Sequence, residues 1–229
     1  NAMLSERHLL DALEDALELE TLTLKGFEPV GGGDINQAAV AMTSAGRFFV
    51  KWNDAAPPAL FAREFEALET LRDTDSELRI PEPITVGSSE STDFLVMEYI
   101  PPGARGANWE ARYGRGLAQL HQTGADAFGF DHDNYCGTTP QPNDWTDDWT
   151  VFYRDQRLRP RFEGVRTQHS VTSDQQRGFE RLMERLILLG IAPSAGNLPP
   201  ARLGRTADDL LTADRKLEVD AVRLYREAL

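Results

Sequence analysis

Apolar residues recur at helical spacing near the start of the chain. Leu9, Leu13 and Leu17 lie four positions apart, which places them on one side of a helix. Ser5 stands where a helix N-cap is expected. The pattern therefore predicts an amphipathic helix over residues 4–19, with its apolar side against a core.

Shorter apolar segments follow and are typical of strands. Gly and Pro residues separate them, and one pair is joined by a short turn at residues 44–46, which predicts a β-hairpin. Between the hairpin and the later strands, the apolar residues from 60 to 71 return to helical spacing. Strands are predicted over 21–30, 38–43, 47–52, 84–87 and 93–99.

Beyond a Pro-rich joint at 101–103 the pattern becomes helical. The order helix, hairpin, helix, two strands and joint is the outline of a kinase-type N-terminal lobe. We therefore expect an α+β fold with a small antiparallel sheet lobe over 4–100 and a helical lobe over 101–229. Helices are predicted over 109–122, 145–158 and 172–189, and a long loop rich in Gly, Pro, Asn and Asp over 126–144.

Composition narrows the class of protein. The net charge of −13 opposes binding to nucleic acid. The single cysteine forms no intrachain disulfide, which fits a reducing cytoplasm. The sequence has neither an apolar run long enough to span a membrane nor a secretory signal. We expect a cytoplasmic protein without nucleic-acid or membrane partners, and its oligomeric state stays open.

Candidate chemistry begins at a glycine-rich turn. Backbone N–H groups of Gly32 and Gly33, with Asn36 just after them, are suited to approach phosphates. A plain hairpin turn is the alternative. Lys51 follows on the second strand of the hairpin, where kinase folds place the lysine that contacts the α- and β-phosphates. A surface lysine is the ordinary interpretation of Lys51 taken alone.

A phosphate-binding lysine needs an acidic partner to hold it. Glu64 lies on the next predicted helix between apolar positions that can face the sheet, and Glu66 is the second choice. The strand that ends at Glu98, Tyr99 and Ile100 enters the Pro-rich joint. Its backbone N–H and C=O groups are candidates for the adenine edge of a nucleotide, although an ordinary strand end fits equally.

A long segment of the chain resembles the signature of fructosamine and ketosamine kinases. The resemblance lies in Phe128 to Asn143, which reads FGFDHDNYCGTTPQPN, and continues through DWTDDW at 144–149. Gly-Gly-Asp-Ile-Asn at 32–36, Phe-Phe-Val-Lys at 48–51 and the strand at 94–99 also match that family, and the resemblance covers roughly residues 6–193.

The resemblance implies a two-lobe, protein-kinase-like fold in which the helical lobe is truncated. It also implies ATP-dependent, Mg²⁺-assisted phosphorylation of the 3-hydroxyl of a sugar joined to an amine. The substrate would be a small-molecule glycated amine or a protein-bound fructosamine. It implies Lys51 at the phosphates, Glu64 as its partner, and Glu98, Tyr99 and Ile100 at the hinge.

The pattern departs from the family at the catalytic loop. That loop reads His-Gly-Asp, four residues, Asn, and later Asp-Pro, and this sequence contains no His-Gly-Asp. Residues 210–219 resemble the hairpin after the loop, which puts Asp209 and Asp220 at the two magnesium positions. Asp208 is the candidate for the catalytic aspartate, and the alternative for Asp208 and Asp209 is a solvated acidic turn.

Three interpretations of this departure stay open. The protein is a catalytically inactive, kinase-like binding protein; or the sequence lacks residues that the native molecule has; or Asp208, Asp209 and Asp220 form a partial metal site that supports weak activity. The second hypothesis for function is thus a binding protein that keeps the fold but transfers no phosphate.

Overall fold

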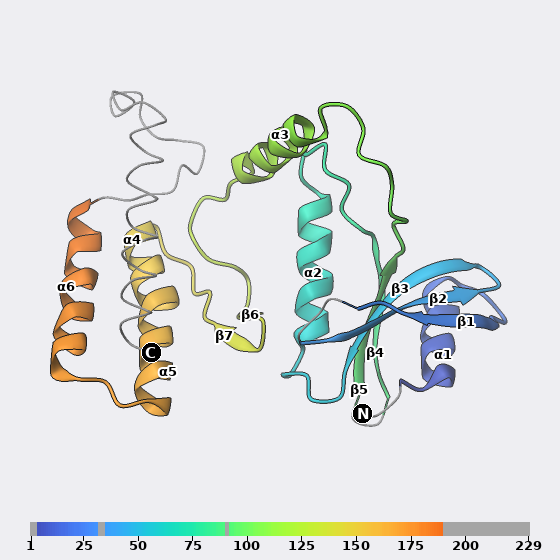
Figure 1. Cartoon of the computed structure of the whole chain (residues 1–229), viewed down its shortest axis with the longest axis horizontal. Coiled ribbons are helices and arrows are strands. Elements are labelled where there is room, and N and C mark those ends of the chain that lie inside the picture. Colours follow the sequence, from blue (N-terminus) through green and yellow to red (C-terminus); the bar gives the residue numbers. More distant parts are fainter. Residues whose placement is uncertain (1–3, 32–34, 90–91, 190–229) are drawn as a thin grey trace. The chain divides into compact units, whose positions relative to one another are not determined.

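The computed structural model describes residues 4–31, 35–89 and 92–189, which form two compact units (Figure 1). The first unit lies within Asn1–Thr123 and Asn134–Pro140, and the second within Gly124–Asp133 and Gln141–Leu229. The predicted division at residue 100 stays a prediction.

An antiparallel five-stranded sheet is the centre of the first unit. Its strand order is β1-β2-β3-β5-β4, so β3 lies between β2 and β5. The register pairs Lys51 on β3 with Ala38 on β2 and with Leu95 on β5. The strands are β1 Leu24–Pro29, β2 Gln37–Thr43, β3 Gly46–Asn53, β4 Pro83–Ser89 and β5 Thr92–Glu98.

One face of this sheet packs against helix α1, Glu6–Ala16. Leu9 and Leu13 of α1 are buried, and they join a core that includes Val50 and Trp52 of β3. Full burial of an aliphatic side chain of this kind contributes about 1.5–3 kcal/mol. The predicted helix over 4–19 is therefore correct in type but too long, because Glu18 adopts a positive φ of 54° and ends it.

The opposite face packs against helix α2, Leu60–Arg72, which runs beside β5 (Figure 1). Phe61 of α2 is buried with Leu95 and Met97 of β5, and Phe49 of β3 packs against them. Because alternate strand residues point to opposite faces, the two clusters use alternate positions of β3. Lys51 belongs to the α2 face.

Helix α3, Trp109–Gln122, groups with the sheet unit and has the bounds that the sequence predicted. The Ser76 hydroxyl donates a hydrogen bond of 2.7 Å to the Gly116 carbonyl. Gly116 also allows close packing, since a Cβ there would lie 2.6 Å from Leu78 Cγ. These contacts attach α3 to the segment that follows α2.

The predicted loop over 126–144 contains a short hairpin. Strands β6, Asn134–Cys136, and β7, Thr139–Gln141, pair with each other, and Gly137 in the turn has a positive φ of 64°. Tyr135 Oη donates to the Pro58 carbonyl at 3.1 Å, and β6 packs near α2. Most of this hairpin therefore belongs to the sheet unit.

The second unit is helical. The helix predicted over 145–158 begins four residues later than expected, because Asp148 caps it at Trp149 by accepting from the backbone N–H groups of Thr150 and Val151. A π-helical turn then interrupts the α-helical pattern. The elements are α4 Trp149–Phe152, the π-helix Tyr153–Leu158, α5 Arg159–Gln168 and α6 Ser173–Leu189. Within the described ranges, no helix combines the length and apolarity needed to cross a membrane.

Candidate functional site

Strand β3 and helix α2 bring a lysine and a glutamate together. Lys51 Nζ donates a hydrogen bond of 2.5 Å to Glu64 Oε1. The two side chains are only 24% and 31% exposed, so much of this ion pair is shielded from water. A cation held in this way keeps one defined position while part of it stays accessible to a ligand.

The local sequence explains this geometry. Alternation along β3 sends Lys51 to the α2 face, next to Leu95 on the neighbouring strand. Helix α2 places Phe61, Phe65 and Leu68 against the same face, so Glu64 lies among residues that pack on the sheet. The predicted pairing of Lys51 with Glu64 is confirmed as a contact.

The second choice for the partner, Glu66, is occupied elsewhere. Arg63 of the same helix donates to both of its carboxylate oxygens, at 3.2 and 2.9 Å. Glu64 is thus the α2 carboxylate that the structure joins to Lys51.

Of the predicted phosphate-binding turn, the structure describes only its end. Gly32 and Gly33 lie outside the described residues. Asn36 is described, and its Oδ1 accepts a hydrogen bond of 3.0 Å from Asn53 Nδ2. Sequence reasoning missed Asn53, and the signal that could have found it is its position two residues after Lys51 on the same strand.

The predicted hinge residues end strand β5. The Glu98 carboxylate accepts hydrogen bonds from Arg79 and from the Glu82 backbone N–H. The hydrogen bond from Arg79 is the main reason that the pKa of Glu98 lies below its ordinary value of 4.5. Arg47 lies over the Tyr99 ring, 4.8 Å from its centroid.

The Glu98 backbone N–H already donates to the Glu82 carbonyl at 2.7 Å, so an adenine edge would rely on the backbone of Tyr99 and Ile100 that follows. Ile100 is partly buried. Sequence reasoning missed Arg79, because nothing in its local pattern distinguishes it from a solvated arginine.

The residues predicted to bind magnesium lie outside the part of the chain that the structure describes. These are Asp209 and Asp220, and the candidate catalytic residue Asp208 lies there too. Among the described residues, no group of three or more His, Cys, Asp or Glu side chains is arranged to hold a metal ion.

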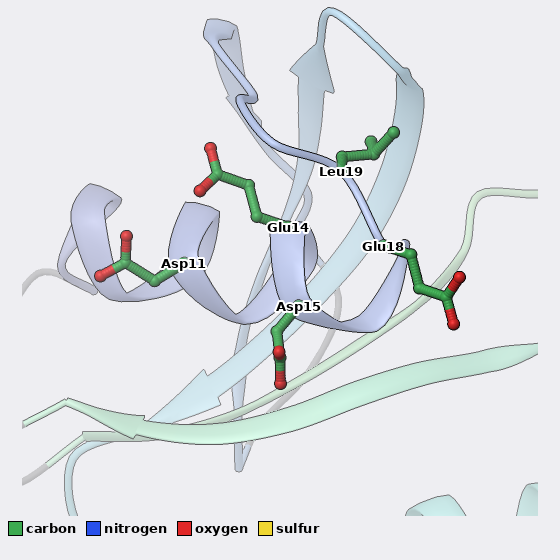
Figure 2. A pocket seen from close by; sticks show the side chains of 5 residues that line it. All are labelled: Asp11, Glu14, Asp15, Glu18 and Leu19. Atoms are coloured by element: carbon green, nitrogen blue, oxygen red, sulfur yellow. The ribbon is translucent and has the colours of Figure 1, made fainter.

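A shallow hollow on helix α1 is acidic and separate from the Lys51–Glu64 pair. Leu19 and the carboxylates of Asp11, Glu14, Asp15 and Glu18 line it. Figure 2 shows that these carboxylates point in different directions around the helix, so they do not converge on one point. Glu14 also accepts a hydrogen bond from the Leu22 backbone N–H.

The parts of the signature segment that belong to the second unit meet at a buried asparagine. Asn143 is 2% exposed and donates from its backbone N–H to Asp133 and from Nδ2 to the His132 carbonyl. Arg157 of the π-helical turn donates to Asn143 Oδ1 and to the Pro142 carbonyl. Trp145, two residues further on, is 50% exposed.

The sequence of the chain was compared with models of protein families. The family model described as fructosamine kinase matches residues 8–198. The chain belongs to the fructosamine kinase family. The resemblance read from the signature segment and from Phe-Phe-Val-Lys is thereby confirmed.

Individual relatives agree with this assignment. Protein-ribulosamine 3-kinase of Arabidopsis thaliana is 39% identical over 152 residues, which are 65% of this chain and 46% of the relative. A candidate ketoamine kinase of Synechocystis is 41% identical over 130 residues, 56% of this chain and 44% of the relative. The chain thus spans about half the length of these curated relatives.

Solved structures confirm the predicted fold class. A candidate fructosamine-3-kinase of Haemophilus somnus matches with a TM-score of 0.68 at 22% identity, over 79% of this chain and 59% of that one. An identity this low supports the fold and no more. The kinase-like α+β fold of this family member is therefore shown.

Proposed function

We propose that this fructosamine kinase family member binds ATP and belongs to an enzyme that transfers the γ-phosphate to a sugar hydroxyl of a ketosamine. The observation that carries the proposal is the ion pair between Lys51 and Glu64 on the α2 face of the sheet. Phosphoryl transfer depends on positioning and on electrostatic stabilisation of phosphate charge, and a lysine fixed by a carboxylate supplies both.

The nucleotide would lie along the predicted residues of the sheet unit. Lys51 is partly exposed, so its ammonium group can reach the α- and β-phosphates while Glu64 holds it. We propose that Gly32 and Gly33 offer backbone N–H groups to the phosphates and that Asn36 ends this turn. The backbone of Tyr99 and Ile100, directly after Glu98, is the proposed contact for adenine, since the Glu98 N–H is bonded to the Glu82 carbonyl.

Magnesium is part of the proposal through the chemistry of kinases. The ion would neutralise phosphate charge, and carboxylates are the oxygen ligands that it prefers. Asp209 and Asp220 are the proposed ligands and Asp208 the proposed proton acceptor, all outside the described residues.

The proposed second substrate is a glycated amine. The curated relatives are named for ribulosamine and ketoamine substrates. We propose a ketosamine, either as a small molecule or on a protein side chain, as the phosphate acceptor.

A transfer assay tests the proposal. The protein is incubated with ATP labelled at the γ-phosphate, Mg²⁺ and either ribulosyl-lysine or fructosyl-lysine, and labelled ketosamine is measured. We expect transfer by the native protein, loss of transfer in Lys51→Met and retention in Arg63→Met, which removes an equal charge from another α2 ion pair. Saturable ATP binding without transfer would instead support the inactive binding protein, which the missing His-Gly-Asp triplet favours. Absence of ATP binding would reject both.

A further inference from the structure

A pair of asparagines closes the end of the β2–β3 ladder. Asn53 is the last residue of β3, and Asn36 immediately precedes β2. Asn53 Nδ2 donates to Asn36 Oδ1 at 3.0 Å and to the Ile35 carbonyl at 3.1 Å. The Ala55 backbone N–H donates to Asn53 Oδ1 at 2.8 Å. One amide therefore joins three segments of the chain.

The sheet register places this pair beside the lysine. Lys51 is opposite Ala38, and Asn53 and Asn36 each lie two residues away from that pair. Residues two apart on a strand share a face, so Asn53 projects to the same side as Lys51. The asparagine pair thus lies next to the Lys51–Ala38 pair on the α2 face.

Burial raises the contribution of these hydrogen bonds to stability. Asn53 is only 9% exposed, so a lost hydrogen bond there is only partly replaced by water. The bond from Ala55 also ties β3 to the segment that leads into α2, the helix that carries Glu64. Asn53 therefore holds two segments against β3. One is the Ile35–Asn36 segment, and the other is the segment at Ala55 that leads into the helix of Glu64.

The Ile35–Asn36 segment has a second contact, with the turn of the β6–β7 hairpin. A Cβ at Gly137 would lie 3.0 Å from Ile35 Cδ1, so the turn of the β6–β7 hairpin packs directly on Ile35. The Ile35–Asn36 segment thus contacts both the hairpin turn and the Asn53 amide, while the Ile35 residue stays 47% exposed.

We infer that Asn53 is a positioning residue for nucleotide binding, which acts by holding Ile35 and Asn36 at a fixed place beside Lys51. This inference rests on the proposed function. The Asn36 side chain is hydrogen-bonded to Asn53, so under this inference Asn36 influences ATP binding through the position of its backbone. An asparagine with only a structural role would stabilise the ladder. Its replacement would then change ATP affinity no more than the loss of any other ladder contact.

Thr43 offers a matched control at the other end of the same ladder. It pairs with Gly46 and is 5% exposed. Its hydroxyl donates to the Gly46 carbonyl at 3.0 Å and accepts from the Ala45 N–H at 3.1 Å. Thr43→Val removes hydrogen bonds of the same kind, from a similarly buried residue, without touching Asn36.

The first measurement is amide hydrogen exchange without nucleotide. We expect Asn53→Ala to speed exchange at Asn36, Gln37 and Ala55, while Thr43→Val does so near Ala45 and Gly46. Unchanged exchange at residues 36–37 in Asn53→Ala would overturn the tie itself. This result does not depend on whether the protein binds ATP.

The second measurement is the Kd for Mg²⁺-ATP by titration calorimetry. We expect Asn53→Ala to weaken binding about tenfold, equivalent to about 1.4 kcal/mol, while Thr43→Val stays within about twofold of the native value. Asn36→Ala should weaken binding in the native background but add little to Asn53→Ala, because both act through one contact. An unchanged Kd in Asn53→Ala, or an undiminished Asn36→Ala effect in that background, would overturn the inference. If the native protein binds no ATP, the proposed function and the positioning role fall together, and only the exchange result on the tie remains.

Discussion

The ion pair between Lys51 and Glu64 predicts an energetic coupling that can be measured without any ligand. At an effective dielectric constant of about 20, opposite charges 2.5 Å apart attract by about 7 kcal/mol before desolvation. Desolvation of the two groups offsets most of that attraction, since the side chains are only 24% and 31% exposed. We expect a net coupling of about 1–2 kcal/mol, between the values typical of exposed and of buried pairs.

A double-mutant cycle of Lys51→Met and Glu64→Gln measures this coupling. Each single change leaves a shielded charge without its partner, whereas the double change removes both charges. The double variant should therefore lose about 1–2 kcal/mol less stability than the sum of the single variants. Because the chain has two units, the free energy of opening is best taken from hydrogen exchange of β3 amides. Costs that add within about 0.3–0.5 kcal/mol would refute the coupling.

The same variants then separate stability from nucleotide binding. ATP at 100 times its Kd should stabilise the native first unit by about 2.7 kcal/mol. Lys51→Met should lose most of this gain because the phosphates lose their cation, and Glu64→Gln should keep part of it. Arg63→Met should keep all of it, since Arg63 pairs with Glu66. A full ATP gain in Lys51→Met would refute the role of Lys51 at the phosphates and leave the ion-pair cycle intact.

Three further predictions concern other parts of the chain. The pKa of Glu98 is lowered chiefly by Arg79, so the ionised carboxylate stabilises the folded state at neutral pH. The native protein should therefore be more stable than Glu98→Gln at neutral pH, and this difference should shrink as pH falls below 4.5. Denaturant unfolding at several pH values measures the difference. Gly129 has a φ of 156°, and a Cβ there would lie 2.9 Å from the Asn143 carbonyl oxygen, so Gly129→Ala should cost about 1–3 kcal/mol in urea unfolding of the second unit. Asn143→Ala should cost about 1–3 kcal/mol by the same assay, because it leaves the buried Arg157 contact and the His132 carbonyl with one partner fewer.

Periodicity was a good guide where one principle decides the structure. The hairpin of β2 and β3 and the helices α2, α3 and α6 lie within a residue or two of the predicted bounds. Periodicity failed where side chains override it. Asp148 caps the backbone at Trp149 and so starts α4 later than the apolar pattern indicates. The β6–β7 hairpin escaped prediction because strands this short carry too few residues to show alternation.

The candidate site was predictable to the extent that it lies on regular elements. Strand alternation placed Lys51 on a face with apolar neighbours, and helical spacing turned Glu64 toward that face; together they predicted the contact. Contacts that depend on three-dimensional proximity gave no such signal. Arg79 reaches Glu98 across 19 residues, and Asn53 reaches Ile35 across 18. Only the folded chain brings these pairs together, because Arg79 and Ile35 lie in segments outside the strands.

Alternate side chains of strand β3 serve different faces of the sheet. Val50 and Trp52 enter the core against α1, while Lys51 and Asn53 project toward α2. Because β3 is hydrogen-bonded on both sides, to β2 and to β5, its backbone is fixed by ladders that include neither the Lys51 nor the Asn53 side chain. A cation and an amide on such a strand cannot shift relative to each other without breaking the ladders or the core behind them. That rigidity is what a phosphate-binding lysine needs, since its contribution depends on staying in place when charge arrives.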